Sequence, residues 1–158
     1  MDQIDQFKQE LVRALDWQDA HANFDAAVQD VPVELRGVQL EGLPYSLWQL
    51  LEHTRICQYD ILEFSRDPNY RELKFEEYWP PTVAPPSEDA WEKSIASFHA
   101  DLESLKQLFM DKSIDLVANI PHGTGQTYLR ELILVIDHNA YHLGQMVIIR
   151  RLLSNWSS

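Results

Sequence analysis

The stretch TYLRELILVIDHNAYHLGQMVIIRRLL, residues 127–153, is typical of one long amphipathic helix. Thr127 is a suitable N-cap, and apolar residues recur after it at steps of three and four. His138 and His142 follow the same steps as their apolar neighbours, as does Gln145, so both imidazoles are expected to face the interior. A helix with one apolar face needs other elements to cover that face, and the rest of the chain supplies further helical patterns.

The two histidines are four residues apart, which places one ring above the other on a helix. At that spacing both rings can reach one metal ion at the ~2.0–2.1 Å that zinc prefers for imidazole nitrogen. A third ligand must come from elsewhere, and His53, in a helical segment upstream, is the best candidate. The alternative is that each is a core histidine satisfied by an ordinary hydrogen bond, which spacing alone does not exclude.

The remaining candidate ligands have weaker claims. His99 lies in a charged helical stretch, His122 lies in a Pro-His-Gly-Thr-Gly loop, and His21 is left undecided. Cys57 follows His53 by four residues and could be a fourth ligand. A free cysteine is more often a small buried hydrophobe, and we favour that interpretation.

Three further helices are expected, over residues 2–29, 46–67 and 87–110. The first is predicted from apolar residues at helical spacing: Ile4, Phe7, Leu11, Leu15, Ala22 and Ala26. Ser46 and Gln49 predict a capping box at the start of the second helix, and Ser87 is the expected N-cap of the third. The intervening residues 68–86 are rich in aromatics and proline, so we expect a long ordered loop laid across the helices.

Composition limits the function classes. A chain of 158 residues is expected to form one domain, spanning 1–158, with a single core. The formal net charge of −12 argues against nucleic acid and anionic membranes as partners and favours a small-molecule substrate or a protein. No signal peptide or membrane span is predicted, and the single cysteine cannot form an internal disulfide, so a cytoplasmic location is expected.

Several motifs together resemble the DinB/YfiT-like superfamily. They are Ser46-Leu47-Trp48 leading to Glu52-His53, then Asp60-Ile61-Leu62, and finally Asp137-His138-Asn139-Ala140-Tyr141-His142-Leu143-Gly144-Gln145. The resemblance covers nearly the whole chain, and the final His-x3-His followed by Gly-Gln is its most specific part. It implies an all-α four-helix bundle in which His53, His138 and His142 bind a divalent metal, usually zinc or nickel.

The resemblance also implies a homodimer and, for members of known activity, metal-dependent transferases and isomerases that use low-molecular-weight thiols. Three imidazoles leave a coordination position open, so we predict a thiol S-transferase or a related enzyme. Glu131, Asp60 and His21 are candidate acid or base groups, each equally explained as an ordinary helix-surface residue. The alternative is a non-catalytic, metal-stapled dimeric protein with an interaction or stress-response role.

Overall fold

The computed structural model describes residues 3–156. Within these residues the chain forms α-helices and short 3-10 helices and has no β-strand, so the predicted all-α class is confirmed. The α-helices are α1 (Gln3–Arg13), α2 (Phe24–Val28), α3 (Leu47–Arg66), α4 (Ala90–Met110) and α5 (Tyr128–Leu152). The 3-10 helices are η1 (Ala14–Asp16), η2 (Val33–Leu35) and η3 (Phe75–Tyr78).

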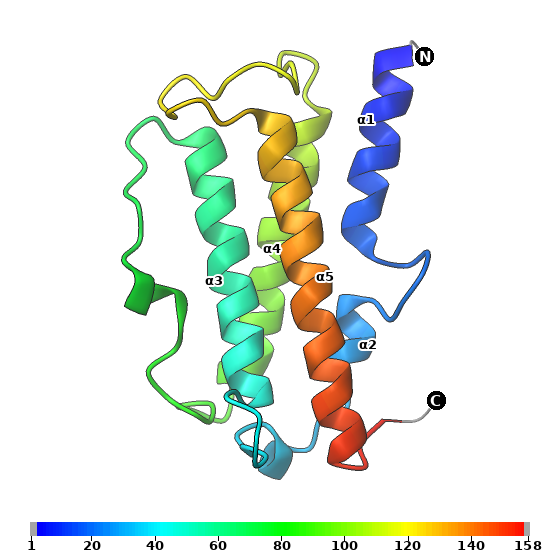
Figure 1. Ribbon diagram of the computed structural model, residues 1–158, viewed down its shortest axis with the longest axis vertical. Coiled ribbons are helices and arrows are strands. Elements are labelled where there is room, and N and C mark those ends of the chain that lie inside the picture. Colours follow the sequence, from blue (N-terminus) through cyan, green and yellow to red (C-terminus); the bar gives the residue numbers. More distant parts are fainter. Residues whose placement is uncertain (1–2, 157–158) are drawn as a thin grey trace.

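Helix α3 is the central element of the packing, because it contacts both α4 and α5 extensively. Helices α3 and α5 lie side by side and run in opposite directions, with α4 behind them and α1 packed on α4 (Figure 1). The short α2 packs on the C-terminal half of α5 (Figure 1). Between the helices lies a core that includes the fully buried Trp91, Phe98, Phe109, Leu51 and Leu132.

The predicted first helix over residues 2–29 is wrong in its length. The helix ends at Arg13, continues as η1, and is broken at Trp17, whose φ of 51° places it in the left-handed region. Trp17 is buried, and its indole N–H donates to the carbonyl of Ile136 on α5. A second helix then starts independently, because the Asn23 side chain caps α2 by accepting from the backbone N–H of Ala26.

The N-terminal half of α1 also differs from the prediction. Ile4 and Phe7 are exposed, whereas Lys8, directly after Phe7, is buried. The Lys8 ammonium donates to the backbone carbonyls of Asp111 and Ile114, which follow α4. The sequence pattern thus assigned the buried face incorrectly, since a lysine that binds carbonyl oxygens can occupy an interior position.

The start of α3 agrees with its sequence signal and the start of α4 does not. The Ser46 hydroxyl accepts from the N–H of Gln49, and the Gln49 side chain accepts from the N–H of Ser46, which completes the predicted capping box. Ser87, by contrast, does not cap α4. Its hydroxyl donates to the Asp89 carboxylate, and α4 begins only at Ala90 without a side-chain cap.

The segment between α3 and α4 returns along the outer side of α3 (Figure 1). Apart from η3 it has no helix, and two hydrogen bonds fix its last part to the start of α3. The Ser46 hydroxyl donates to the carbonyl of Val83, and the Trp48 indole N–H donates to Thr82. The segment therefore covers one face of α3, which brings Tyr78 and Trp79 to the middle of that helix.

Helix α5 is long and apolar enough by composition to span a membrane. It packs against α3, however, and its buried residues include Glu131, Asn139 and His142. A core helix of a soluble protein has the same composition, and the buried polar groups on α5 are most consistent with that role.

Replacing Ser46 with Ala should lower the free energy of unfolding by about 1–2 kcal/mol, because the N-cap of α3 and the bond to Val83 are both lost. Urea denaturation measures this change. The matched control is Ser87→Ala, which removes an exposed serine that does not cap a helix and should change stability by less than about 0.5 kcal/mol. Equal effects of the two substitutions would contradict the assignment of the caps.

Candidate metal centre

Three imidazoles converge between α3 and α5. The ring centroid of His53 on α3 lies 5.0 Å from that of His138 and 4.7 Å from that of His142, both on α5. The two α5 rings are 4.5 Å apart. The Nε2 atoms of His53 and His138 are separated by only 3.2 Å. His53 and His142 are buried, and His138 is partly buried.

The tautomer of His53 is determined by the backbone. Its Nδ1 lies 2.7 Å from the carbonyl oxygen of Tyr78. A carbonyl oxygen can only accept, so Nδ1 carries the proton and donates it. In the neutral ring, Nε2 then has a free lone pair that points toward His138.

The tautomer of His138 is determined by a chain of three hydrogen bonds that crosses the core. The Gln58 side chain donates from Nε2 to the carbonyl of Phe98 on α4, at 2.8 Å. This leaves Gln58 Oε1 to accept from Asn139 Nδ2 at 2.9 Å, and Asn139 Oδ1 then faces His138 Nδ1 at 3.3 Å. Because the chain starts at a carbonyl, its direction is fixed, and His138 Nδ1 must be the donor. Its Nε2 is therefore also unprotonated in the neutral ring.

The tautomer of His142 is determined by a side chain of the same helix. Its Nδ1 lies 2.7 Å from Oε1 of Gln145, one helical turn later, and donates to it. Burial, with smaller contributions from the charges of His138 and His53, lowers the pKa of His142 to about 4, although the hydrogen bond to Gln145 opposes the shift. Burial also lowers the pKa values of His53 and His138. All three rings are thus neutral at pH 7, with Nδ1 protonated and Nε2 free.

Two lone pairs that face each other at 3.2 Å repel unless a cation lies between them. A proton is disfavoured there, because burial lowers the pKa values of both rings. A metal ion fits the distance: two nitrogens on one tetrahedral zinc, each at ~2.0–2.1 Å, are roughly 3.3–3.4 Å apart. In metalloproteins a histidine ligand is oriented by a hydrogen bond from the ring nitrogen that does not bind the metal. The Nδ1 atoms of these three rings donate hydrogen bonds of this kind. The residues therefore fit a divalent metal ion.

Cys57 belongs to the same cluster, with one ligand atom of His53, Cys57 and His138 within 4.8 Å of each other. Its sulfur lies 3.6 Å from Nδ1 and 3.7 Å from Nε2 of His53. A nitrogen and a thiolate sulfur on one tetrahedral zinc are roughly 3.5–3.6 Å apart. The 3.7 Å between the Cys57 sulfur and the unprotonated Nε2 of His53 is close to this distance, so Cys57 also suits a metal site. Burial, with a contribution from Asp60, raises the pKa of the Cys57 thiol to about 12, so without a metal it stays protonated.

An aromatic stack covers one side of the cluster. Trp79 lies parallel to the His53 ring at 3.8 Å, and Tyr45 stacks on the other face of Trp79 at 4.0 Å. Trp79 and Tyr45 come from the two segments that flank α3, so the loops on both sides close over His53. The stack restricts the rotation of His53 and shields that side of the cluster from water.

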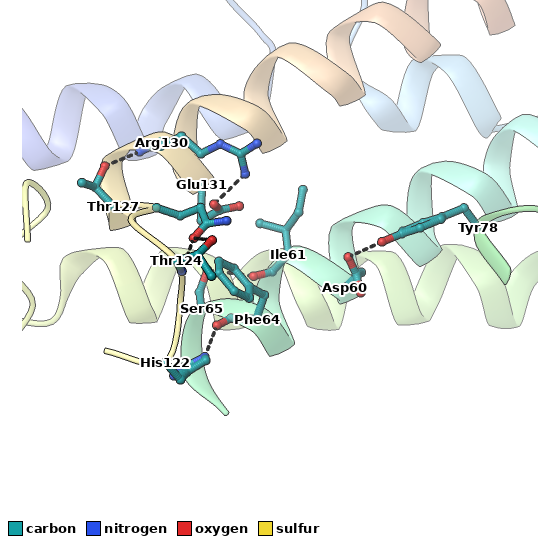
Figure 2. A network of polar contacts seen from close by, with 11 residues as sticks. Asp60, Ile61, Phe64, Ser65, Tyr78, His122, Thr124, Thr127, Arg130 and Glu131 are labelled. Atoms are coloured by element: carbon teal, nitrogen blue, oxygen red, sulfur yellow. Dashed lines mark hydrogen bonds and ion pairs between the residues drawn. The ribbon is translucent and has the colours of Figure 1, made fainter. Parts of the chain in front are cut away.

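A polar cavity of about 570 Å³ lies farther along the groove between α3 and α5. Asp60 from α3 and Glu131 from α5 both line it (Figure 2). Tyr78 also lines it and connects it to His53. The Tyr78 carbonyl accepts from His53, and its hydroxyl donates to Asp60 at 3.0 Å. Tyr70 donates to the other oxygen of Asp60 at 2.9 Å.

The two carboxyl groups in this cavity have shifted acidities. Burial raises the pKa of Asp60, although the hydrogen bonds from Tyr70 and Tyr78 oppose the shift. Burial also raises the pKa of Glu131, with an added contribution from the charge of Asp60, while Arg130 opposes it. Glu131 is 1 % exposed. The structure thus brings together two of the three predicted acid or base candidates.

The third candidate, His21, lies apart from them. It is exposed, and its Nδ1 contacts the carbonyl of the adjacent Ala22. The two other histidines also have their own partners. His99 contacts Asp25 at 2.8 Å, and His122 donates to the carbonyl of Phe64 at 2.7 Å. None of these three has a contact with the cluster among those found in the described residues 3–156.

Sequence reasoning did not single out Gln58, Asn139 or Tyr78. Gln58 and Asn139 are fully buried, although polar residues at such positions are usually expected at the surface. Tyr78 acts on His53 through its backbone carbonyl, for which the sequence carries no signal. Sequence reasoning placed Gln145 in the inward-facing stripe of α5 and in the family motif, and the structure makes it the partner of His142.

The fold and cluster define an all-α protein with a buried group of histidine and cysteine side chains, held between two antiparallel helices, that could bind a metal ion. A family model described as the DinB superfamily matches residues 16–146, most of the chain. The chain therefore belongs to the DinB superfamily, as its motifs indicated. Comparisons with curated proteins and with solved structures gave no significant match.

The metal-free protein should lose stability as the pH falls from about 6.5 to about 4. His142 has an ordinary pKa of 6.5 when unfolded and a pKa of about 4 when folded, so in this range the unfolded state binds more protons. The contribution of His142 to the free energy of unfolding is complete above pH 6.5 and is lost as the pH falls through about 4. Urea denaturation at a series of pH values measures it. The control is His142→Gln, whose stability should fall less over the same range, and parallel curves would contradict the low pKa.

Proposed function

We propose that this chain is a metal-dependent enzyme that binds zinc or nickel at the cluster and transfers a thiol sulfur to a small electrophilic substrate. One observation supports the metal site above all others. The Tyr78 carbonyl accepts a hydrogen bond from His53, and the Phe98 carbonyl orients His138 through Gln58 and Asn139. Each ring is left with a lone pair on Nε2, and the two Nε2 atoms face each other at 3.2 Å. A divalent cation removes their repulsion and is bound by both.

The proposed ligands are His53, His138 and His142, the histidine triad to which the family motifs map. His142 is included because its Nδ1–H is engaged by Gln145, which frees Nε2, and because its ring lies close to both other rings. Cys57 is the competing third ligand. We favour His142, because the neutral imidazole is ready to bind whereas the buried thiol must first lose a proton.

Three protein ligands leave a coordination position for an exogenous group. A thiol bound beside a divalent ion at these three histidines would have a lowered pKa and would therefore be a thiolate at neutral pH. The sulfur would then attack an electrophilic carbon, forming a C–S bond while the leaving group departs with its electron pair. The proton lost by the thiol must be accepted by a base.

Asp60 and Glu131 are the proposed groups for proton transfer. Both line the cavity that Tyr78 connects to the cluster, and burial raises the pKa values of both toward the range useful for acid–base catalysis at neutral pH. Tyr70 and Tyr78 hold the Asp60 carboxylate in one orientation. Trp79 excludes water from the His53 side of the centre.

A second candidate function is a non-catalytic, metal-stapled protein with an interaction or stress-response role. It is favoured by the positions of the proposed ligands, because His53 lies on α3 and the other two lie on α5. An ion bound by all three would cross-link the two helices and add to the stability of the fold.

Metal content distinguishes the two possible third ligands. Protein purified without an affinity tag should hold about one zinc or nickel ion per chain, because a site of three ligands binds one ion. His53→Ala, His138→Ala and His142→Ala should each lose most of it, whereas Cys57→Ser should retain it. Mass spectrometry of the native protein measures the content. Loss of metal in Cys57→Ser with retention in His142→Ala would make the cysteine the third ligand, and a cobalt-substituted protein would then show a thiolate charge-transfer band.

Activity distinguishes the enzyme from the staple. The metal-loaded protein should couple a low-molecular-weight thiol to a haloalkyl electrophile, and Glu131→Gln should lower kcat roughly 100-fold without loss of metal. Asp60→Asn should act in the same direction. Glu34→Gln, at an exposed residue that does not line the cavity, is the control and should leave the rate unchanged. A large loss of thermal stability on metal removal, with no activity for any thiol tested, would favour the staple.

A further inference from the structure

An apolar pocket of about 220 Å³ lies in the groove between α3 and α5. It is formed where the start of α3, with the segment before it, lies beside the C-terminal half of α5 (Figure 1). Within the described residues 3–156, no charged side chain lines this pocket. Its aliphatic and aromatic lining consists of Leu43, Pro44, Tyr45, Leu50, Ile148 and Ile149, and Gln145 completes it.

The apolar pocket and the polar cavity lie on opposite sides of the histidine cluster. On α3, Leu50 of the apolar pocket precedes His53 by three residues, and Asp60 of the polar cavity follows His53 by seven. These separations are about 4.5 Å and about 10.5 Å along the helix, in opposite directions. The order on α5 is the reverse, because α5 is antiparallel to α3 (Figure 1). The cluster thus lies between two pockets of different chemical character.

Two residues that line the apolar pocket also contact the cluster or its aromatic cover. Gln145 accepts a hydrogen bond from His142 Nδ1 at 2.7 Å. Tyr45 stacks on Trp79, and Trp79 in turn stacks on His53. A group bound in the pocket therefore lies only one or two side chains away from two of the proposed metal ligands.

The pocket suits a compact, uncharged apolar group. Leu50 and Ile149 are 1 % and 4 % exposed, so a charged group placed against them would lose hydration without gaining an ion partner. A dry cavity of roughly 150 Å³ with a comparable lining holds one benzene molecule, which has six carbon atoms. By the same ratio, this pocket holds at most about nine carbon atoms.

From its lining, size and position, we infer that the apolar pocket binds an aliphatic or aromatic group of about six to nine carbon atoms. Which reactant carries this group rests on the proposed function. The thiol must give its proton to Asp60 or Glu131 in the polar cavity, so it approaches the cluster from that side. The apolar group therefore belongs to the electrophile, and it stays attached to the carbon that forms the C–S bond while the leaving group departs.

Binding of 1-alkanols to the metal-loaded protein tests the pocket without any reaction. Affinity should rise about fourfold with each added methylene group, because each buries further apolar surface. The rise should stop near about nine carbon atoms, where the pocket is full. NMR titration measures each affinity, and saturable shifts should appear at the side-chain amide of Gln145, which lines the pocket. The amide of Gln126, which lines the polar cavity, is the internal control and should not shift.

Two substitutions should move this size limit in opposite directions, which misfolding cannot do. Ile148→Trp, at the exposed edge of the pocket, fills part of it and should weaken 1-octanol binding at least about tenfold. Leu43→Ala enlarges the pocket and should extend the rise in affinity to longer alkanols. The matched control is Ile133→Trp, on the same helix and 51 % exposed against 54 % for Ile148, which should leave 1-octanol binding unchanged.

Rates with 1-bromoalkanes of the same chain lengths separate this inference from the proposed function. The value of kcat/KM should rise with chain length up to the limit found for the alkanols, and Ile148→Trp should lower that limit. If alkanols bind at Gln145 but no bromoalkane reacts with any thiol, the pocket is confirmed as a binding site and the proposed transfer is wrong. If bromoalkanes react at rates independent of chain length, or the Gln145 amide does not shift, the inference is overturned. Equal shifts at Gln126 and Gln145 would also overturn it.

Discussion

The short contact between the Nε2 atoms of His53 and His138 depends on hydrogen bonds made at the opposite sides of both rings. One ring donates to a backbone carbonyl in the loop after α3, and the other donates to a chain of buried amides that ends at a backbone carbonyl of α4. Carbonyl oxygens cannot reverse their role, so the two lone pairs are directed at each other by the fold itself. Helices α3, α4 and α5 and the loop must all be in place for this geometry to exist.

The long segment between α3 and α4 has a corresponding structural role. It is attached near the start of α3 through Ser46 and Trp48, and this attachment holds Tyr78 and Trp79 against His53. Tyr78 also reaches Asp60 in the adjacent cavity. One loop thus orients a proposed ligand, covers it with an aromatic ring and connects it to the carboxyl groups, so changes in the loop would alter the cluster and the cavity together.

The two sides of helix α5 differ in composition. Its inward side carries His138, His142 and the buried Asn139, whereas its outward side carries the exposed Ile133, Tyr141, Ile148 and Leu152. The apolar period predicted the inward side correctly, because residues at steps of three and four share a face. The same rule failed for the start of α1, where Lys8 is buried and Ile4 is exposed, since the partners of the lysine are carbonyls more than a hundred residues away.

The sequence by itself determined the all-α class, the capped start of α3, the extent of α5 and the placement of two histidines on successive turns of one helix. These features depend on capping and periodicity between residues a few positions apart, which a sequence displays directly. Only the tertiary structure decided the break at Trp17, the ring tautomers, and the gathering of Cys57 with the histidines. Each of these depends on contacts between residues that are distant in sequence, such as the hydrogen bond from Gln58 to Phe98. A local sequence pattern does not indicate such contacts.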